Sequence, residues 1–374
     1  MRGAMISPIV IAAGGTGGHL FPAEALAGAL SGRGARVALM TDARSGALAA
    51  KGFSGLETFV LKGEGLAGRG LSRAPGAILA LGRGTVQAAR ILSRINAAAV
   101  VGFGGYPSFP PLLAARLLRR RLPTILHEQN AVLGRANRFL AARVDRIALS
   151  FPATLGIAGG EAAKCVITGN PVRPPIAALA GEAYAPPASD APLRLLVLGG
   201  SLGARIFADV VPAALAGLAP AFRARISVAQ QVREEDFSRV QAAYAEAGIA
   251  AELSKFFTDV DRRLADCHLL VARAGGGQVA EAACAGRPAI FVPLPSAIDD
   301  HQTANARAAA EAGAALVMPQ PAFTAEALRA RLEDFLCSPA QLARMAEAAA
   351  ARAVPDAAQR LADLVQALVP EAAR

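Results

Sequence analysis

A run of glycines that ends in a histidine, Gly14 to His19, is the first feature of this sequence that could do chemistry. It follows a short apolar segment and precedes a helix predicted to open near Pro22. Glycines let a backbone approach a phosphate closely, and the N–H groups and dipole of a helix start favour its negative charge. His19, at the mouth of the loop, is a candidate catalytic base; a packing turn with a structural histidine is the alternative.

Two further polar clusters follow predicted strands in the same half of the chain. The sequence GFGGYPS, residues 102–108, lies between a strand and a helix, so two glycine loops at adjacent strand ends could hold one diphosphate jointly. The sequence HEQN, residues 127–130, comes directly after another strand. Four polar side chains are costly to bury without partners, so we expect them to face a cleft; a capped helix start is the alternative.

The second half of the chain repeats this pattern. The sequence GGSLGAR, residues 199–205, follows an apolar strand and has the composition of a phosphate loop. A second glycine run, within residues 273–281, opens a helix in which Glu281 could accept hydrogen bonds from ribose hydroxyls or remain solvated. Asp259 and Asp261 have the Asp-x-Asp spacing of some metal sites, but they precede a helical run, and we expect them to cap that helix instead.

The elements that must position these loops follow from hydrophobic periodicity. Short apolar runs alternate with helical patterns, which predicts parallel sheets covered by helices, with ligands at the carboxyl ends of the strands. We expect each strand of the first half to lead into an amphipathic helix, and Pro171–Pro192 to be a linker region. The predicted strands are Pro8–Ala12, Arg36–Thr41, Ala98–Gly102, Thr124–His127, Arg146–Leu149, Lys164–Thr168, Leu193–Leu198, Arg225–Ala229, Ala251–Ser254, Leu269–Ala272, Ala289–Pro293 and Ala315–Met318.

The composition limits the class of protein. With 374 residues, of which 53% are hydrophobic, the chain is long enough for about two domains with large cores. Four widely separated cysteines predict neither a disulfide framework nor a zinc site and favour a reducing cytoplasm. No apolar stretch approaches the roughly 18 residues of a spanning helix, and the apolar start of the chain runs into glycines rather than a cleavage site.

Positive charge gathers in the first half of the sequence. Residues 1–173 contain 21 Lys and Arg against 7 Asp and Glu, whereas the remainder contains 18 against 22. The basic half should attract an anionic partner. Nucleic acid is disfavoured, because the chain has no Trp and few aromatic residues for base stacking. An anionic membrane surface fits better, because arginines are interleaved with apolar residues from Leu66 to Ile95; ordinary solvated helix faces are the alternative.

Six motifs in a fixed order carry a resemblance to a known family. They are GGTGGHLFPA (14–23), GFGGYPS (102–108), HEQNAVLGRANR (127–138), TGNPVR (168–173), GGSLGAR (199–205) and GRPAIFVPLP followed by DHQTANA (286–306). On these motifs the chain resembles the MurG family over essentially its whole length. The resemblance implies an α/β fold of two doubly wound Rossmann-like domains facing a cleft, the glycosyltransferase B fold.

The resemblance also implies a division of labour between the two domains. Residues 1–173 plus about 355–374 would form an N-terminal domain that binds the acceptor and the membrane, with a final helix near Asp356–Val369 crossing back onto it. Residues 174–354 would form the C-terminal domain that binds the UDP-sugar.

The implied activity is that of an inverting hexosyltransferase in peptidoglycan synthesis. The enzyme would transfer N-acetylglucosamine, in a β-1,4 linkage, from UDP-N-acetylglucosamine to lipid I and so form lipid II. Lipid I is the undecaprenyl-diphosphate-linked muramyl-peptide acceptor. The resemblance implies no metal or other cofactor and a peripheral location on the cytoplasmic face of the bacterial inner membrane.

Individual residues take roles from the same resemblance. The uridine would lie against Arg173 and the backbone near Phe257, Glu281 would bind the ribose, and Ser201 would approach the donor diphosphate. The other donor contacts would be Thr16, Gly17, Gly18, Asn130, Gly276 and Gln302. The acceptor diphosphate would be held by Gly14, Gly15, Gly104, Gly105, Tyr106 and Ser108.

His19 and Glu128 would lie nearest the reacting hydroxyl. We prefer His19 as the base, with Glu128 either orienting it or serving instead, and the sequence leaves the choice open. The chain also departs from the usual family pattern, which puts single side-chain contacts in doubt. The departures are Leu202, Ala274, Gln278 and Ser296.

Three other classes of protein share part of this pattern. An NAD-dependent oxidoreductase would recognise ribose through Asp42, but Leu20 stands where its third fingerprint glycine belongs, and no Gly-Lys-Ser/Thr of a P-loop follows either. A UDP-N-acetylglucosamine 2-epimerase would keep the fold and change the chemistry. A membrane scaffold without activity would leave several phosphate-type loops without a role.

Overall fold

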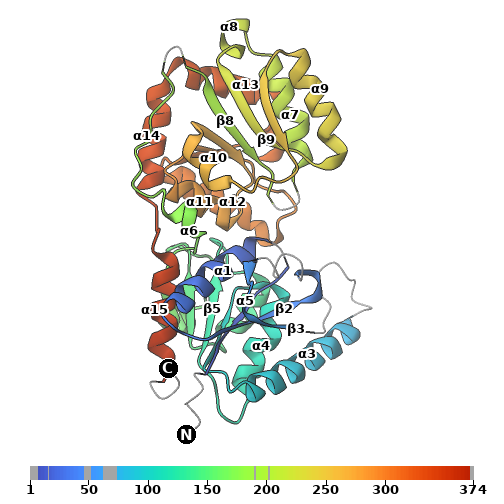
Figure 1. Ribbon diagram of the computed structural model, residues 1–374, viewed down its shortest axis with the longest axis vertical. Helices are drawn as coiled ribbons and strands as arrows, with labels where there is room; N and C mark the ends of the chain where they lie inside the picture. The colour runs from blue at the N-terminus through green and yellow to red at the C-terminus, as the bar shows by residue number, and fades with distance from the viewer. Residues whose placement is uncertain are drawn as a thin grey trace. The chain divides into compact units, whose positions relative to one another are not determined.

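The structure is a computed structural model that describes residues 7–15, 17–45, 52–61, 74–188, 191–200 and 203–370, except for the side chains of residues 44 and 74–78. The chain divides into two units, one built from residues 1–173 and 356–374 and the other from residues 174–355. Each unit has its own parallel sheet and its own helices (Figure 1). The parallel α/β architecture predicted from the sequence is confirmed.

The first unit is built on a seven-stranded sheet in the order β3-β2-β1-β4-β5-β6-β7. The strand order reverses between β1 and β4, so the loops after these two strands meet at the switch point where doubly wound sheets bind ligands. The strands are β1 (Ile9–Ala12), β2 (Val37–Asp42), β3 (Glu57–Leu61), β4 (Ala99–Gly102), β5 (Thr124–Glu128), β6 (Arg146–Leu149) and β7 (Cys165–Ile167).

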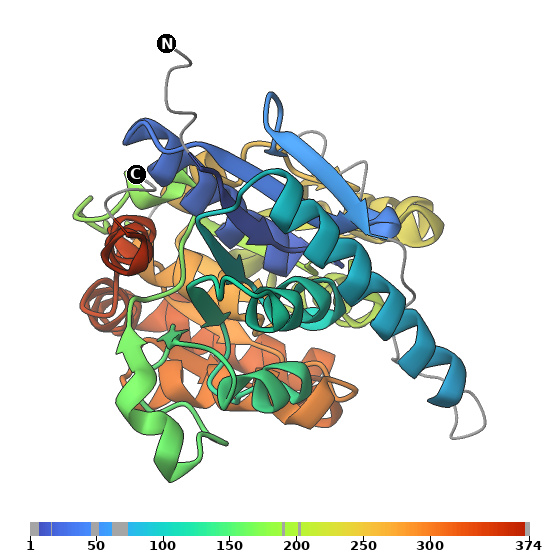
Figure 2. The same cartoon turned by 90° about the horizontal axis from the view of Figure 1, so that it is seen from below.

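Helices cover the two faces of this first sheet because successive residues of a strand point to opposite sides. Ile9 and Ile11 of β1 pack with α1 and α15, whereas Val10 packs with α3, α4 and α5. Figure 2 shows α3 and α4 lying side by side. The helices are α1 (Gly17–Gly32), α3 (Ala74–Arg94), α4 (Gly105–Leu117), α5 (Arg135–Ala141) and α15 (Ala357–Leu368), with short 3-10 turns η1 (Ala43–Ser45) and η3 (Gly159–Lys164).

The last helix of the chain, α15, belongs to the first unit. Its Leu361 and Val365 are fully buried in the core beside α1. Arg33, just after α1, donates hydrogen bonds to Asp363 at 2.6 Å and to Gln366 at 2.9 Å. Figure 1 shows the red α15 running beside the blue α1. The two ends of the chain therefore share one hydrophobic core.

The second unit contains a six-stranded sheet in the order β10-β9-β8-β11-β12-β13. Leu195 and Val197 of β8 pack with residues of α7, α9 and α13, while α10 lies against β8 as well. The strands are β8 (Leu193–Leu198), β9 (Ile226–Gln231), β10 (Ala250–Ser254), β11 (Leu269–Ala272), β12 (Ala289–Phe291) and β13 (Ala315–Val317). The helices are α6 (Pro174–Ala177), α7 (Arg205–Ala216), α8 (Pro220–Arg223), α9 (Phe237–Glu246), α10 (Val260–Asp266), α11 (Gly276–Cys284), α12 (His301–Glu311), α13 (Ala325–Cys337) and α14 (Pro339–Ala350), with 3-10 turns η4 (Glu234–Asp236), η5 (Ile298–Asp300) and η6 (Gln320–Ala322).

Two features of the first sheet differ from the sequence prediction. The edge strand β3 was not predicted, because its residues are largely solvent-exposed and lack a clear apolar pattern. The expectation of a helix after every strand was wrong for β6, which leads through a loop and the 3-10 turn η3 into β7. Among the described residues, no helix is both long enough and apolar enough to cross a bilayer.

Candidate active site

In each unit, the candidate site residues lie in the loops at the carboxyl ends of the strands. We call the ends of these strands and the loops of the first sheet the first edge, comprising residues 13–19, 41–45, 103–108, 127–137 and 168–173. The loops of the second sheet are the second edge, comprising residues 199–205, 255–259, 273–281 and 292–302. Thr16, Ser201 and Leu202 lie outside the described residues, so their predicted roles have no structural account.

The glycine loop after β1 is held closely by its neighbours. A Cβ added to Gly14 would lie 2.9 Å from the Cγ atom of Pro107 and 3.0 Å from the hydroxyl of Ser45, so no larger residue fits. The exposed Gly15 donates its backbone N–H to the Ser45 hydroxyl at 2.6 Å, and that hydroxyl donates in turn to the buried carboxylate of Asp42. Asp42 therefore braces this loop through Ser45.

The glycine loop after β4 meets the first loop through a buried hydroxyl. The Ser108 side chain is 0% exposed, and its oxygen lies 2.8 Å from the carbonyl oxygens of both Ala12 and Gly104. Gly104 and Gly105 have φ values of +83° and +68°, which glycine adopts without strain, and α4 begins at Gly105. The structure thus brings together the two glycine loops that the sequence analysis assigned to one diphosphate.

The imidazole of His19 lies against this second loop. Its Nδ1 atom is 2.7 Å from the carbonyl oxygen of Phe103, and a Cβ added to Gly105 would lie 3.6 Å from its Nε2 atom. A carbonyl oxygen can only accept, so the proton of the neutral ring is on Nδ1 and the lone pair is on Nε2. The His19 ring is therefore in the tautomer that can take a proton at Nε2.

A second side chain contacts the same ring nitrogen. The amide of Gln129 lies 3.1 Å from Nδ1 of His19. Because Nδ1 carries the proton, we assign the amide oxygen of Gln129 to this contact. This role of Gln129 was not predicted, and its only signal in the sequence is the position of Gln129 in the HEQN segment.

The carboxylate of Glu128 is buried and braces its own loop. One oxygen accepts hydrogen bonds from the backbone N–H and the side-chain amide of Asn130, at 3.0 and 3.1 Å. The other accepts from the backbone N–H of Gly134 at 2.9 Å and from the amide of Asn137 at 2.7 Å. These four bonds occupy both oxygens and fix residues 128–137 into one conformation.

Other buried polar atoms of the first edge have no hydrogen-bond partner among the described residues. His127 is fully buried against the ring of Phe103, and burial lowers its pKa to about 4, so the ring is neutral. Buried polar atoms are normally hydrogen-bonded, so such atoms mark a surface that binds a polar ligand or solvent. They include Nδ1 of His127, Oδ1 of Asn137, Oγ1 of Thr41 and both amide atoms of Asn170.

Arg173 and Tyr106 also lie at the first edge, both half-buried. The Arg173 guanidinium stands over the ring of Phe21 in α1, 4.9 Å from its centroid. A cation over an aromatic face has a fixed orientation, so Phe21 determines where this arginine points. The structure therefore joins the predicted Arg173 to the helix that carries Gly17, Gly18 and His19.

The glycine loop after β8 begins the second edge. A Cβ added to Gly199 would lie 2.4 Å from the backbone nitrogen of Ala204, so only glycine fits. Gly200 has a φ of +84°, and α7 begins at Arg205. Gly199 is therefore packed directly against the residue that precedes α7.

The glycine run after β11 leads directly into α11. The backbone carbonyl of Ala274 accepts a hydrogen bond of 3.0 Å from the buried side chain of Asn305 in α12. α11 begins at Gly276, which directs its first N–H groups out of the helix end. Glu281 lies in its second turn and is half-buried.

The buried Arg273, immediately before this run, joins two other loops. Its guanidinium donates to the carbonyl oxygens of Val292 and Pro293, at 3.0 and 3.1 Å, and to the Gln320 side chain at 2.7 Å. The ends of β11 and β12 are thereby linked through one side chain.

The approach to α12 contains unusual backbone. Asp299 and Asp300 both have positive φ, at 55° and 51°, and such outliers cluster at functional sites. The Asp300 carboxylate accepts a hydrogen bond of 2.6 Å from the Thr303 hydroxyl. In the first turn of α12, the side-chain amide oxygen of Gln302 accepts a hydrogen bond of 3.0 Å from the backbone N–H of Leu294.

Phe257 lies buried in the loop that follows β10. The guanidinium of Arg263 lies over its ring, 3.9 Å from the centroid, and also hydrogen-bonds to Glu252 and Asp259. Asp259 occupies the N-cap position of α10, but its side chain accepts from Arg263 instead of capping the helix. Hydrogen bonds from Arg263 hold the pKa of Asp259 below its usual value. No cluster of three metal-binding side chains occurs in the described part of the chain.

Three departures from the family pattern can be located. Ala274 is buried, Gln278 is half-buried in the first turn of α11, and Ser296 is exposed. The glycine framework around the first two is intact, since α11 still begins at Gly276.

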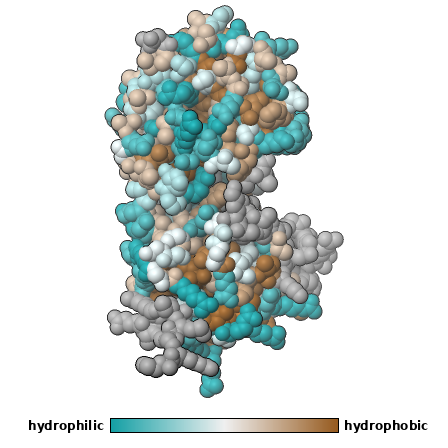
Figure 3. All heavy atoms as spheres, in the orientation of Figure 1, coloured by the Kyte–Doolittle hydropathy of each residue, from teal (hydrophilic) through white to brown (hydrophobic). Residues whose placement is uncertain are grey.

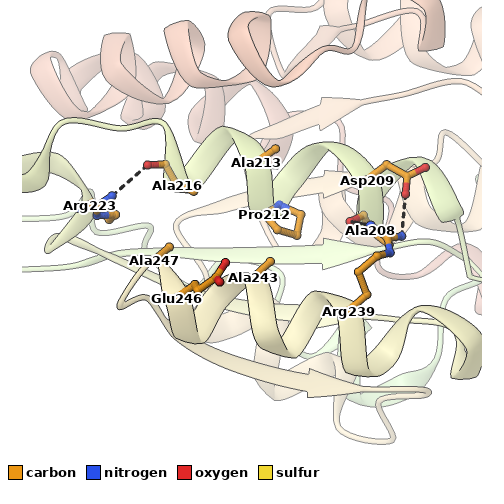
Figure 4. A pocket seen from close by; sticks show the side chains of 10 residues that line it. All are labelled: Ala208, Asp209, Pro212, Ala213, Ala216, Arg223, Arg239, Ala243, Glu246 and Ala247. Carbon is orange, nitrogen blue, oxygen red and sulfur yellow. Dashed lines mark hydrogen bonds and ion pairs between the residues drawn. The ribbon is translucent and has the colours of Figure 1, made fainter.

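A groove of about 550 Å³ on the second unit lies between α7 and α9 (Figure 4). Five of its ten lining residues are alanines, and Arg239 at one end is bonded to Asp209 and Asp236. At the other end, Arg223 donates to the carbonyl of Ala216. Its arginines thus have protein partners, and none of the predicted site residues lines it.

Comparison with known proteins identifies related sequences. Residues 9–149 match the glycosyltransferase family 28 N-terminal domain, and residues 194–361 match the glycosyltransferase family 28 C-terminal domain. A relative from Granulibacter bethesdensis is 56% identical over 359 residues, which cover 96% of this chain and 93% of the relative. That relative is named UDP-N-acetylglucosamine--N-acetylmuramyl-(pentapeptide) pyrophosphoryl-undecaprenol N-acetylglucosamine transferase.

Solved structures extend the comparison. The crystal structure of Acinetobacter baumannii MurG superposes with a TM-score of 0.77 at 32% identity, covering 96% of this chain and 99% of that one. A UDP-N-acetylglucosamine 2-epimerase superposes with a TM-score of 0.64 at 14% identity, covering 95% of this chain and 94% of the epimerase. At 14% identity the likeness concerns the fold alone, so it does not support the epimerase alternative.

Proposed function

Because this chain belongs to the family of UDP-N-acetylglucosamine--N-acetylmuramyl-(pentapeptide) pyrophosphoryl-undecaprenol N-acetylglucosamine transferases, we propose that His19 is the base of its reaction. The chain is a hexosyltransferase with the glycosyltransferase B fold. It transfers N-acetylglucosamine from UDP-N-acetylglucosamine to lipid I and forms lipid II in peptidoglycan synthesis.

The proposed reaction is a single displacement with inversion. The acceptor hydroxyl attacks the anomeric carbon from the face opposite UDP, and a new carbon–oxygen bond forms while the bond to UDP breaks. UDP leaves with the bonding electrons, and the hydroxyl proton passes to Nε2 of His19. The observation that carries this assignment is the 2.7 Å contact between Nδ1 and the Phe103 carbonyl, which leaves the lone pair on Nε2. A positioned base contributes about 10²–10⁴ in rate.

We propose a different role for Glu128. Its two oxygens accept four hydrogen bonds from residues 130–137, so both oxygens are directed at backbone and amide donors of their own loop. Glu128 then acts on the reaction by holding its loop, and the adjacent Gln129 orients the imidazole of His19. The hydrogen bonds favour His19 over Glu128 as the base.

We assign most of the donor contacts to the second edge. The N–H groups and dipole at the start of α11 would stabilise the negative charge that develops on the leaving diphosphate. Glu281 would accept bonds from the ribose hydroxyls, and the backbone at Phe257 would meet the uracil. The remaining proposed donor contacts are Thr16, Gly17, Gly18, Asn130, Arg173, Ser201, Gly276 and Gln302.

We assign the acceptor diphosphate to the paired glycine loops of the first edge. The hydroxyl of Ser108 is bonded to backbone carbonyls, so it would act by joining the loops instead of touching the ligand. Backbone N–H groups would contact the phosphates, since they are the donors that glycine loops offer. The proposed contacts are Gly14, Gly15, Gly104, Gly105, Tyr106 and Ser108.

We further propose that the first unit attaches peripherally to an anionic membrane, at the cytoplasmic face of the inner membrane. Leu79, Arg83, Val86 and Arg90 follow one another at helical spacing along α3, and all four are exposed. Leu79 is 55% exposed and Val86 51%, so this helix face presents apolar side chains between its arginines. Figure 3 shows hydrophobic and hydrophilic residues intermixed on the visible face of the first unit.

Three other residues of the predicted membrane surface, Arg69, Leu71 and Arg73, lie outside the described residues, and the side chain of Ile78 is not described either. Leu81 and Ile91 are half-buried, and Arg94 is exposed with its guanidinium 5.6 Å from the centroid of the Phe59 ring. The exposed stripe on α3 therefore carries the proposal.

The test of the proposed function is direct transfer. The protein is incubated with radiolabelled UDP-N-acetylglucosamine and a lipid I analogue, and we expect the label to enter the lipid. The control omits the acceptor: N-acetylmannosamine or free UDP formed without it would instead indicate 2-epimerase chemistry. The same assay on His19→Ala, with UDP binding measured in parallel, separates the assignment of the base from the activity itself.

A further inference from the structure

A single side chain, Gln231, connects two of the loops of the second edge. It is the last residue of β9, and β9 lies between β8 and β10 in the sheet. Its amide oxygen accepts the backbone N–H of Gly199 at 3.1 Å. Its amide nitrogen donates to the carbonyl oxygens of Gly200, at 3.1 Å, and Lys255, at 3.2 Å. The loop after β8 and the loop after β10 are thus joined through the strand between them.

The chemistry of these three contacts requires an amide at this position. A glutamine side chain has two N–H donors and one carbonyl oxygen, and here both donors and the oxygen are engaged. A carboxylate of the same shape would set one oxygen against two carbonyl oxygens and would repel both. Gln231 is only 8% exposed, so water cannot readily replace the lost bonds.

The two connected loops are held on their other sides as well. At Gly199 and Gly203 an added Cβ would lie 2.4 Å from the Ala204 nitrogen and 2.6 Å from the Arg233 side chain, so both glycines pack closely against their neighbours. Beyond Lys255, Phe257 is covered by Arg263, which is bonded to Glu252 and Asp259. Gln231 therefore links two segments that are each in contact with their own neighbours.

We propose that Gln231 is a positioning residue that sets the distance between the diphosphate loop and the nucleoside loop, and so governs the affinity for a ligand that spans both. The inference rests on the proposed assignment of the donor diphosphate to the loop at Gly200 and of the uridine to the backbone near Phe257. Gln231 acts through backbone groups and does not itself contact the donor. Holding two half-sites at the correct spacing lowers the ordering cost of binding a ligand that bridges them.

The experiment compares a ligand that spans both loops with one that meets a single loop. UDP binding is measured by calorimetry and uridine binding by NMR titration, on the wild-type protein and on Gln231→Glu. We expect the Kd for UDP to rise about 10- to 100-fold, as for the loss of two to three buried hydrogen bonds, and the Kd for uridine to change less than about 3-fold. In the transfer assay, KM for UDP-N-acetylglucosamine should rise with the Kd for UDP, while KM for the lipid acceptor should not.

The matched control is the neighbouring residue. Gln230 is also a fully buried glutamine of β9, but its side chain is bonded to the hydroxyl of Tyr244 and to neither loop. Gln230→Glu should lower the melting temperature without separating UDP from uridine. If Gln231→Glu does not fold, Gln231→Met, which has a similar volume and no amide, supplies the same comparison.

The outcomes separate this inference from the proposed function. A wild-type protein that binds no UDP would contradict the donor assignment, and this inference with it. Wild-type binding together with unchanged UDP affinity in a folded Gln231 variant would overturn the inference alone. Equal losses for UDP and uridine, or the same pattern in Gln230→Glu, would also overturn it, because they would indicate a general structural role.

Discussion

The carboxyl edges of the two sheets are built differently, although both sheets are parallel and doubly wound. At the second edge, buried polar side chains are used to join loops: Gln231, Arg273 and Asn305 each hydrogen-bond to loop backbone. At the first edge, Ser108 and Glu128 do the same.

Only the first edge, within the described part of the chain, also keeps a group of buried polar atoms without partners. These atoms belong to Thr41, His127, Asn137 and Asn170. In the second unit, the corresponding atoms belong to Arg225, Gln230 and Arg287, which lie outside the second edge.

The difference in hydrogen bonding between the two edges indicates how one type of fold can bind two kinds of substrate. A site whose polar groups are already bonded to one another is preorganised and recognises the shape of a compact ligand such as a nucleotide. A site that retains unused hydrogen-bonding capacity gains bonds when a polar ligand enters. We therefore expect substitutions in the loops of the second edge to change donor affinity, and substitutions of His19 and Glu128 at the first edge to change the rate of transfer or the stability of the unit.

The largest expected effect is that of His19→Ala. Removing the imidazole should lower kcat by about 10²–10⁴, because the acceptor proton then has no positioned base. UDP affinity should change little if the donor nucleotide is bound by the second edge. The wild-type rate should also fall toward acid pH, where protonation removes the lone pair on Nε2, and this limb should be lost in the variant.

The contrasting variant is Glu128→Gln, which keeps the size of the side chain but replaces one acceptor oxygen with a donor. If Glu128 braces its loop, the variant should melt at a lower temperature and lose less kcat than His19→Ala. A folded Glu128→Gln with collapsed kcat, beside a nearly normal His19→Ala, would make Glu128 the base and reverse our assignment.

The next effect concerns the pH dependence of stability and the buried His127. Its pKa is lowered from 6.5 to about 4 in the folded protein, mainly by burial, so the unfolded chain binds the proton more readily. The contribution of His127 to the free energy of unfolding is therefore fully present above pH 6.5. It is lost as the pH falls toward 4, by up to about 3 kcal/mol.

Chemical denaturation between pH 4 and 7 measures this effect, with His127→Asn as the comparison. The wild-type protein should lose more stability than the variant over that range. Burial also lowers the pKa of His268, in the second unit, to about 4. The variant His268→Asn therefore allows the same comparison in the second unit. Parallel pH curves for wild type and His127→Asn would show that His127 does not resist protonation.

A smaller effect is expected for Glu281→Ala at the second edge. If the carboxylate accepts bonds from ribose hydroxyls, its loss should weaken UDP and UDP-N-acetylglucosamine alike, by roughly 1.5–3 kcal/mol. Calorimetry with both ligands measures this, and kcat at saturating donor should be nearly unchanged. Unchanged UDP affinity in a folded variant would remove Glu281 from the nucleotide site.

The smallest effect per residue is expected on α3. Each arginine near an anionic bilayer contributes about 1 kcal/mol, so Arg83→Glu together with Arg90→Glu should weaken flotation with anionic vesicles, and added salt should do the same to the wild type. Arg329 and Arg331 on α13 of the second unit offer the matched charge reversals. Vesicle binding that is indifferent to salt and to both α3 substitutions would contradict membrane attachment through this helix.

Much of the fold could be predicted because the strands and helices follow from the local spacing of apolar residues in the sequence. Strands such as Arg146–Leu149, Leu193–Leu198 and Leu269–Ala272 have the predicted bounds, since a buried parallel strand is an apolar run between turn residues. The edge strand Glu57–Leu61 was not predicted, because its exposed residues form no such apolar run. The glycine loops were also found, because tight turns after strands demand glycine.

The sequence alone determined the family, the parallel architecture and the residue types at each edge, because these depend on short-range pattern and on the order of the motifs. Only the tertiary structure decided which atoms meet. Whether His19 has its lone pair on Nε2 depends on a carbonyl 84 residues away, and Gln231 reaches loops 31 and 24 residues distant. Such hydrogen bonds arise from strand order and register, which bring distant residues together, and no local pattern encodes them.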